Sequence, residues 1–248
     1  MNTKAAKTLT ATIAATAFAL GSFAATAPAE EETIPTPDTP ILMIGDSMMR
    51  LLGHEMEKAF KKAGIQPAVA FSSLGSGLVR SSVFDWNAKI DELIAEHKPA
   101  TVFVNIGTND RQALEVEGVG MIRYESADEW RAAYSKCIGG VMDRLIAGGV
   151  KRIIWMLLPS MNDTATHEHA MLVNEIVTEQ AAAEKRKDVV TLLDLGPMLS
   201  SRPGKYSRYV TDKKTGNALT GRDPDGVHLS VEGAKYVSRR ILETYWKK

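Results

Sequence analysis

Short runs of apolar residues alternate along this chain with longer stretches in which apolar residues recur at every third or fourth position. A buried strand gives a short continuous apolar run, whereas a helix with one buried face gives the longer spacing. The runs predict five strands, at residues 41–44, 67–71, 101–106, 152–158 and 189–195. The spacing predicts helices at residues 47–63, 87–97, 127–145, 167–187 and 231–246.

Strands that alternate with helices indicate a parallel sheet, because each helix carries the chain back to the start of the next strand. Both faces of such a sheet are covered, which agrees with strands that are apolar throughout. Since these crossovers are right-handed, the sequence predicts a three-layer α/β/α fold with a five-stranded parallel sheet. Ser126 and Glu129 have the spacing of a capping box, and residues 196–227 are expected to form a long irregular connection.

The composition indicates a globular protein with a sizeable core, since 44% of the 248 residues are hydrophobic and 24% are charged. The chain has 30 Lys and Arg residues and 30 Asp and Glu residues, which argues against a generally basic nucleic-acid-binding protein. We therefore expect no nucleic-acid partner. The single cysteine, Cys137, excludes an internal disulfide framework and a cysteine-rich zinc site.

The first 29 residues have the pattern of a secretory signal peptide. Two lysines precede an acid-free apolar stretch, and small residues suited to a signal peptidase predict cleavage after Ala27 or Ala29. The alternative is an uncleaved membrane anchor, for which the stretch is short and weakly hydrophobic. Residues 30–40 are acidic and Pro-rich and are predicted to be a disordered lead-in to a domain over residues 41–248. We therefore expect a periplasmic or secreted protein without a membrane span in the mature chain.

Polar residues and glycines gather directly after the predicted strands, where open α/β sheets bind their ligands. The topology would bring four such segments to one edge of the sheet: Gly45-Asp46-Ser47, residues 73–78, Gly107-Thr108-Asn109-Asp110 and Asp225-Gly226-Val227-His228. Each segment alone is also typical of an ordinary turn or helix cap. Together they supply the groups that acyl transfer through a covalent intermediate requires: a serine, a histidine, an acid and amide donors.

These four segments resemble the four blocks of the SGNH hydrolases, also called GDSL-like esterases and lipases. The resemblance extends from Ile41 to Trp246 and implies the flavodoxin-like fold of that superfamily. Residues 76–80, followed by Asp85-Trp86, resemble an uncharacterised periplasmic branch, the domain of unknown function 459. Two departures stand out: Met48 replaces the usual Leu after the serine, and the second block lacks the Asn that commonly precedes its glycine.

The resemblance implies that Ser47 is the nucleophile. His228 would be the general base, because imidazole titrates near neutral pH. Asp225, three residues earlier, would accept the Nδ1 proton and orient the ring, with Asp223 as the competing acid.

The same resemblance implies an oxyanion hole made of the backbone N–H groups of Ser47 and Gly77 and the side-chain amide of Asn109. Gly75 is the alternative to Gly77. Asp46 and Asp110 are expected to bind loop amides rather than to take part in the chemistry.

Arg80 and Arg111 are candidate substrate-binding residues, because arginine pairs with carboxylate or phosphate; the alternative is that they are solvated surface residues. His167 and His169 are expected to form a solvated helix start, since a spacing of two residues on a helix points the rings apart. No cysteine or acidic cluster completes a metal site there, so we expect neither a metal nor a cofactor.

The sequence thus predicts a serine esterase that removes small acyl groups, acetyl first among them, from a carbohydrate or cell-envelope glycan. The substrate would be a small-molecule or glycan ester. A lipase or lysophospholipase, or an acyltransferase, would use the same residues. The alternative from another class is a non-catalytic glycan-binding or assembly protein on this fold.

Overall fold

The computed structural model describes residues 39–246. The predicted signal peptide, residues 1–29, and residues 30–38 of the predicted lead-in lie outside this range. Among the helices of the described residues, none combines the length and the apolar character needed to cross a bilayer.

Five parallel strands form the central sheet, in the order β2-β1-β3-β6-β7. This is the strand order of flavodoxin-like folds. Each strand corresponds to one predicted from an apolar run, and their bounds are Ile41–Gly45 for β1, Ala68–Ser72 for β2, Thr101–Asn105 for β3, Arg152–Leu157 for β6 and Val190–Asp194 for β7. Because β1 lies between β2 and β3, these three strands end side by side.

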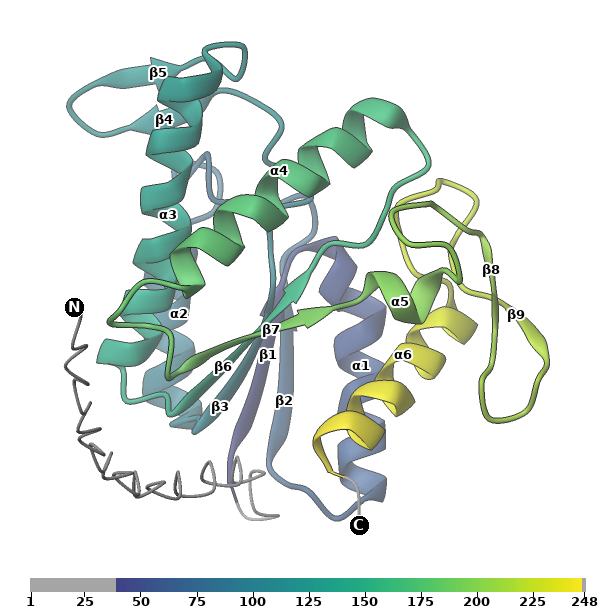
Figure 1. The fold of residues 1–248 in the computed structure, drawn as a ribbon. Helices are drawn as coiled ribbons and strands as arrows, with labels where there is room; N and C mark the ends of the chain where they lie inside the picture. The colour runs from purple at the N-terminus through teal and green to yellow at the C-terminus, as the bar shows by residue number, and fades with distance from the viewer. Residues whose placement is uncertain (1–38, 247–248) are drawn as a thin grey trace, which may run out of the picture. The chain divides into compact units, whose positions relative to one another are not determined.

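Helices cover both faces of this sheet, which confirms the predicted three-layer α/β/α fold (Figure 1). One face is covered by α1 (Ser47–Lys62) and α6 (Val231–Tyr245). The other face is covered by three helices: α2 (Trp86–His97), α3 (Ala127–Ala147) and α4 (Thr164–Ala181).

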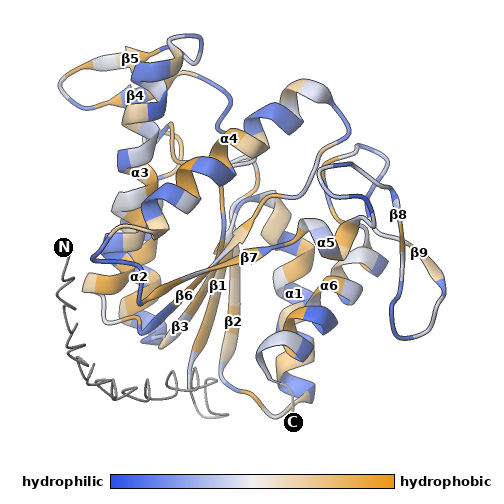
Figure 2. Cartoon of the chain, viewed as in Figure 1, coloured by the Kyte–Doolittle hydropathy of each residue, from blue (hydrophilic) through white to orange (hydrophobic). Residues whose placement is uncertain are grey.

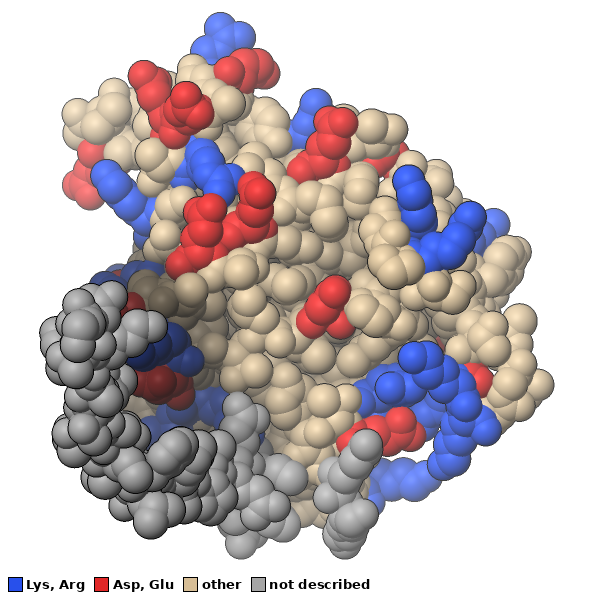
Figure 3. Space-filling view, in the orientation of Figure 1, with Lys and Arg blue, Asp and Glu red and all other residues tan. Residues whose placement is uncertain are grey.

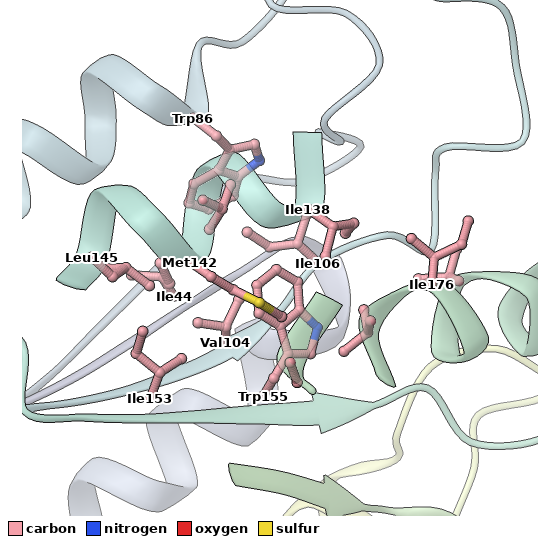
Figure 4. Packing of buried hydrophobic residues seen from close by; sticks show 14 of the residues in the cluster. Ile44, Trp86, Val104, Ile106, Ile138, Met142, Leu145, Ile153, Trp155 and Ile176 are labelled. Atoms are coloured by element: carbon pink, nitrogen blue, oxygen red, sulfur yellow. The ribbon is translucent and has the colours of Figure 1, made fainter. Parts of the chain in front are cut away.

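Side chains of the central strands alternate between two hydrophobic cores. Leu42 and Ile44 of β1 pack with α2, α3 and α4, whereas Ile41 and Met43 pack with α1 and α6. Figure 4 shows part of the first core, in which Trp155 of β6 lies among apolar side chains from several elements. In Figure 2 the hydrophobic colour runs along the strands, and the polar colour is on the outer sides of the helices and in the loops. The predicted elements thus form because their apolar faces are buried on the sheet.

Two antiparallel hairpins, which the apolar pattern does not predict, lie outside the sheet (Figure 1). The first follows β3 and the second lies within residues 196–227, the predicted irregular connection, which also contains the short helix α5. Their bounds are Leu114–Val116 for β4, Gly120–Ile122 for β5, Gly196–Leu199 for α5, Tyr209–Thr211 for β8 and Ala218–Thr220 for β9. These strands are three residues long, which is too short to give a periodic signal.

The cap of α3 and the start of α4 differ from the sequence prediction. The predicted capping box is wrong, because the side chain of Ser126 makes no capping hydrogen bond. The backbone ψ of Ser126 is 66°, far from the extended conformation in which a cap hydroxyl can accept an N–H of the first helical turn. Helix α4 begins at Thr164, before the predicted start, because the side chain of Asp163 accepts the N–H of Thr166.

Candidate active site

The loops after β1, β2 and β3 meet at the carboxyl edge of the sheet. Gly45, the last residue of β1, is paired with Ser72 of β2 and with Asn105 of β3. The segments that follow these strands therefore start from neighbouring positions. The loop that precedes α6 reaches the same edge, where His228 contacts Ser47.

Three side chains form a chain of hydrogen bonds at this edge. Ser47 is the first residue of α1, and its Oγ lies 2.7 Å from Nε2 of His228. Nδ1 of His228 lies 2.6 Å from Oδ2 of Asp225. A proton on Nδ1 bonds to the carboxylate and leaves Nε2 as the acceptor for the serine hydroxyl. This arrangement has the geometry that converts a serine into a nucleophile.

Asp225 accepts two further hydrogen bonds, from the backbone N–H of Val227 at 2.9 Å and of His228 at 3.0 Å. Burial opposes ionisation of this carboxyl group, but the bonds from His228 and Val227 outweigh it and hold the pKa of Asp225 below its ordinary value. Asp223, the competing acid, instead donates its backbone N–H to the carbonyl oxygen of His228 at 2.9 Å. The structure therefore places the side chain of Asp225, not that of Asp223, on the imidazole.

Asp46 is buried beneath the serine and connects the loops after β1 and β3. Its Oδ1 accepts the N–H of Met48 at 2.9 Å, and its Oδ2 accepts those of Gly107 at 3.2 Å and Thr108 at 3.0 Å. Burial raises the pKa of Asp46 to about 6, although these three backbone hydrogen bonds act in the opposite direction. Asp46 thus binds loop amides, as the sequence predicts.

Asn109 lies against the loop that follows β2. It is half-buried, and its Nδ2 donates to the carbonyl oxygen of Ser76 at 2.9 Å. That carbonyl belongs to the peptide bond between Ser76 and Gly77, so the contact holds Asn109 beside the loop that carries Gly77. Asp110 secures the contact, because its carboxylate accepts the N–H of Leu78 at 2.9 Å.

Gly77 and Gly75 differ in what surrounds them. A Cβ atom at Gly77 would lie 1.9 Å from Oδ1 of Asp110, so the position has room only for glycine unless that carboxylate moves. Gly75 has a φ of +68° and nothing within 4 Å of such a Cβ. Glycine is thus required at 77 by close packing and at 75 by backbone shape.

His169 supports the loop after β3, a role that the sequence does not predict. The expectation of a solvated His169 is wrong, because only 1% of the residue is exposed. Its Nε2 lies 3.0 Å from the carbonyl oxygen of Gly107, and its Nδ1 lies 3.2 Å from the hydroxyl of Tyr124. Burial lowers the pKa of His169 and so favours the neutral ring. Because the carbonyl oxygen of Gly107 can only accept, this contact calls for a proton on Nε2. The spacing of four residues to the apolar Val173 was the available signal for a buried face.

The two candidate substrate-binding residues are both exposed. The guanidinium of Arg111 lies over the ring of Tyr124, 5.8 Å from the ring centroid. This contact holds a positive charge two residues along the chain from Asn109. Arg80 lies in the loop that also contains Gly77. On the face shown in Figure 3, basic side chains gather beside α6 with acidic ones among them, and the middle is mostly uncharged with an acidic spot within it.

Within residues 39–246, no group of three or more His, Cys, Asp and Glu side chains could hold a metal ion. His167 and His169 differ in environment, since His169 is buried and His167 is half-buried.

Residues 40–244 match the family described as Protein of unknown function (DUF459). No curated protein matches the sequence.

Several solved structures have a similar fold. They include a lipase/acylhydrolase from Enterococcus faecalis, with 16% identity, a TM-score of 0.54 and coverage of 85% of this chain and 98% of that one. A member of the lipolytic protein G-D-S-L family from Veillonella parvula DSM 2008 has 14% identity and a TM-score of 0.53, with coverage of 85% and 100%. A family two carbohydrate esterase from Clostridium thermocellum, solved with cellohexaose, has 16% identity and a TM-score of 0.51, with coverage of 85% and 65%. At these identities the likeness establishes the fold alone.

Proposed function

We propose that this chain, which belongs to the DUF459 family and has the fold of G-D-S-L lipolytic proteins, is a serine esterase. The observation that carries the proposal is the hydrogen-bonded series Ser47, His228 and Asp225, with distances of 2.7 Å and 2.6 Å between the partners. Fold alone does not specify an activity, whereas this series supplies a nucleophile, a base and an orienting acid.

The first half of the reaction acylates the serine. Nε2 of His228 takes the hydroxyl proton of Ser47 while Oγ attacks the ester carbonyl, which gives a tetrahedral intermediate with a negative oxygen. The intermediate collapses when the C–O bond to the alcohol breaks, and the imidazolium gives its proton to that leaving oxygen. The acyl group then remains on Ser47.

The negative oxygen is stabilised by the predicted oxyanion hole. The N–H of Ser47 lies in the first turn of α1, where backbone N–H groups have no acceptor within the helix. The N–H of Gly77 and the Nδ2 of Asn109 are the other donors. Asn109 uses one Nδ2 proton on Ser76, and the second is available to the substrate.

Water completes the cycle. His228 takes a proton from a water molecule, whose oxygen attacks the acyl carbon, and the second tetrahedral intermediate releases the carboxylic acid as the proton returns to Ser47. The ionised Asp225 stabilises the imidazolium in both halves of the reaction.

The shape of the site favours a small acyl group on a large polar substrate. The side chains of His228 and Asp225 are 37% and 48% exposed, so the reacting atoms lie at the surface rather than in a tunnel. A shallow site admits an ester that projects from a polymer. Arg80 and Arg111 are exposed cations suited to polar or anionic groups on it. We therefore propose acetyl esters of a carbohydrate or cell-envelope glycan as substrates, in the periplasm or outside the cell, where the predicted signal peptide would direct the protein.

The test is reaction of the mature protein with a fluorophosphonate probe, followed by hydrolysis of an ester panel. Labelling should occur on Ser47 and vanish in Ser47→Ala. Acetylated sugars, acetylated peptidoglycan and p-nitrophenyl acetate should be cleaved faster than esters of eight carbons or longer. Preference for the long esters would indicate a lipase, and transfer of acetyl to an added sugar would indicate an acyltransferase. Absence of labelling in the folded protein would refute the esterase and favour a non-catalytic glycan-binding protein.

A further inference from the structure

Arg222 is buried at the base of the loop that carries His228. Only 1% of the residue is exposed. Its backbone pairs with that of Leu229, and the N–H of Asp223 donates to the carbonyl oxygen of His228. Residues 222–229 therefore form a closed loop, and the side chain of its first residue turns inward.

The guanidinium of Arg222 binds backbone rather than a carboxylate. Its Nη1 donates to the carbonyl oxygen of Ser160 at 2.9 Å. Its Nη2 donates to the carbonyl oxygen of Val227 at 2.6 Å and lies 3.4 Å from that of Gly226 and 3.0 Å from the sulfur of Met161. Burial lowers the pKa of Arg222 to about 10, which is the direction expected for a desolvated cation.

A buried cation without a carboxylate partner costs free energy of folding, so an arginine kept at this place points to a specific role for its contacts. The Nε of Arg222 is buried and has no hydrogen-bond acceptor among the described residues, which adds to the cost. The face of the Tyr206 ring covers the guanidinium, 5.3 Å from ring centroid to the central carbon. An apolar side chain would fill the same space without these costs, so bulk alone does not account for an arginine.

The contacts of Arg222 converge on the peptide bond that precedes His228. The carbonyl oxygen of that peptide, on Val227, accepts from Arg222, and its N–H, on His228, donates to Oδ1 of Asp225 at 3.0 Å. The peptide plane is thus held at both ends by charged groups. The imidazole extends from the Cα atom next to this peptide, so the two contacts fix the point from which the side chain of His228 reaches towards Ser47.

We propose that Arg222 is a positioning residue, which holds the peptide between Val227 and His228 so that Nε2 of His228 reaches Oγ of Ser47. The inference rests on the proposed esterase function for its kinetic consequence. Its structural consequence, a fixed imidazole, is independent of any substrate. Arg222 also contacts Ser160 and Met161 in the loop after β6. The loop that carries His228 is therefore attached to the loop of a sheet strand as well as closed on itself.

The kinetic test compares Arg222→Ala and Arg222→Lys with the matched control Arg208→Ala. The guanidinium of Arg208 lies over the exposed ring of Tyr209, so its removal should leave activity unchanged. Displacement of a catalytic group by about 1 Å costs roughly 10²-fold. We expect kcat of Arg222→Ala to fall by about that factor, with KM nearly unchanged. Millimolar guanidinium chloride should restore part of the lost kcat, and the restored rate should level off as the guanidinium concentration rises.

Arg222→Lys keeps the charge but lacks the planar fork, so it should remain folded and lose kcat in the same way. This variant decides the matter if Arg222→Ala does not fold. A folded lysine variant with the kcat of the unmodified protein would overturn the proposal. So would a folded alanine variant whose kcat is unchanged, or whose loss is unaffected by guanidinium.

A spectroscopic test separates this inference from the esterase activity. The Nδ1 proton of His228, bonded to Asp225, should give a low-field proton NMR signal that is absent in Asp225→Asn. We expect that signal to weaken or shift in Arg222→Lys and to be unchanged in Arg208→Ala. If the protein cleaves no ester but the signal depends on Arg222, the function fails and the positioning role stands. A signal unaffected in folded Arg222→Lys would overturn the positioning role.

Discussion

Nε2 of His228 lies 2.7 Å from Oγ of Ser47, although 181 positions of the chain separate the two residues. The contact follows from the packing of α1 and α6 on the same face of the sheet. Ser47 is the first residue of α1, and His228 lies two residues before Ser230, which caps α6. Both helices begin at the carboxyl edge of the sheet, so their packing brings the hydroxyl and the imidazole together.

The role of Asp225 is tested against that of Asp223 by two asparagine variants. Asp225→Asn removes the acceptor for the Nδ1 proton and favours the wrong tautomer of His228, so kcat should fall by about 10⁴-fold. Asp223→Asn should have little effect, because Asp223 meets His228 through its backbone N–H. Steady-state kinetics on one acetyl ester measure kcat for the two variants. A larger loss for Asp223→Asn would reverse the assignment.

Asn109→Ala should lower kcat by about 10²–10³-fold, because it removes one donor to the negative oxygen of the intermediate. KM should change little, since that oxygen carries its full charge only during the reaction. Circular dichroism checks that the variant is folded. Asn87→Ala, which removes an exposed amide from α2, is the matched control. Equal kcat values for the two variants would remove Asn109 from the mechanism.

Alanine at 77 and at 75 should have different effects on activity. In Gly77→Ala the new Cβ would overlap Oδ1 of Asp110, which must release Leu78, so we expect a loss of about 1–3 kcal/mol in unfolding free energy and a large loss of kcat. Gly75→Ala should cost about 1–2 kcal/mol through its positive φ and leave kcat nearly intact. Urea denaturation and kinetics measure both. Retained activity in Gly77→Ala with loss in Gly75→Ala would identify Gly75 as the donor.

Asp46 should make stability depend on pH between about 4 and 6. Its pKa rises from 3.8 in the unfolded chain to about 6 in the buried site, so the folded protein favours the protonated carboxyl. The contribution of this group to stability is therefore fully present below pH 3.8 and is lost as pH rises through about 6. The loss is about 3 kcal/mol for a shift of this size. Urea denaturation at several pH values should show a flatter profile for Asp46→Asn than for the unmodified protein, and parallel profiles would contradict a raised pKa for Asp46.

Local periodicity determined the framework of this protein. Five short apolar runs, such as Ile41 to Ile44, predict the strands of the sheet. A strand that is buried on both faces is apolar at every position, and a few residues are enough to show that pattern. The order of polar segments along the chain also indicated which side chains would gather at the carboxyl edge. The hairpins β4–β5 and β8–β9 escaped prediction, since strands of three residues leave no period to detect.

The tertiary structure alone decided how the site is braced. Asp223 and Asp225 are both close to His228 in sequence; the family resemblance implies Asp225, and the folded loop places the carboxylate of Asp225 on Nδ1. His169 was expected at a solvated helix start, and Arg222 lies in the predicted irregular connection. Both are buried against backbone carbonyls about sixty positions away. Such contacts depend on how separate elements pack on the sheet, and no local pattern along the chain records that packing.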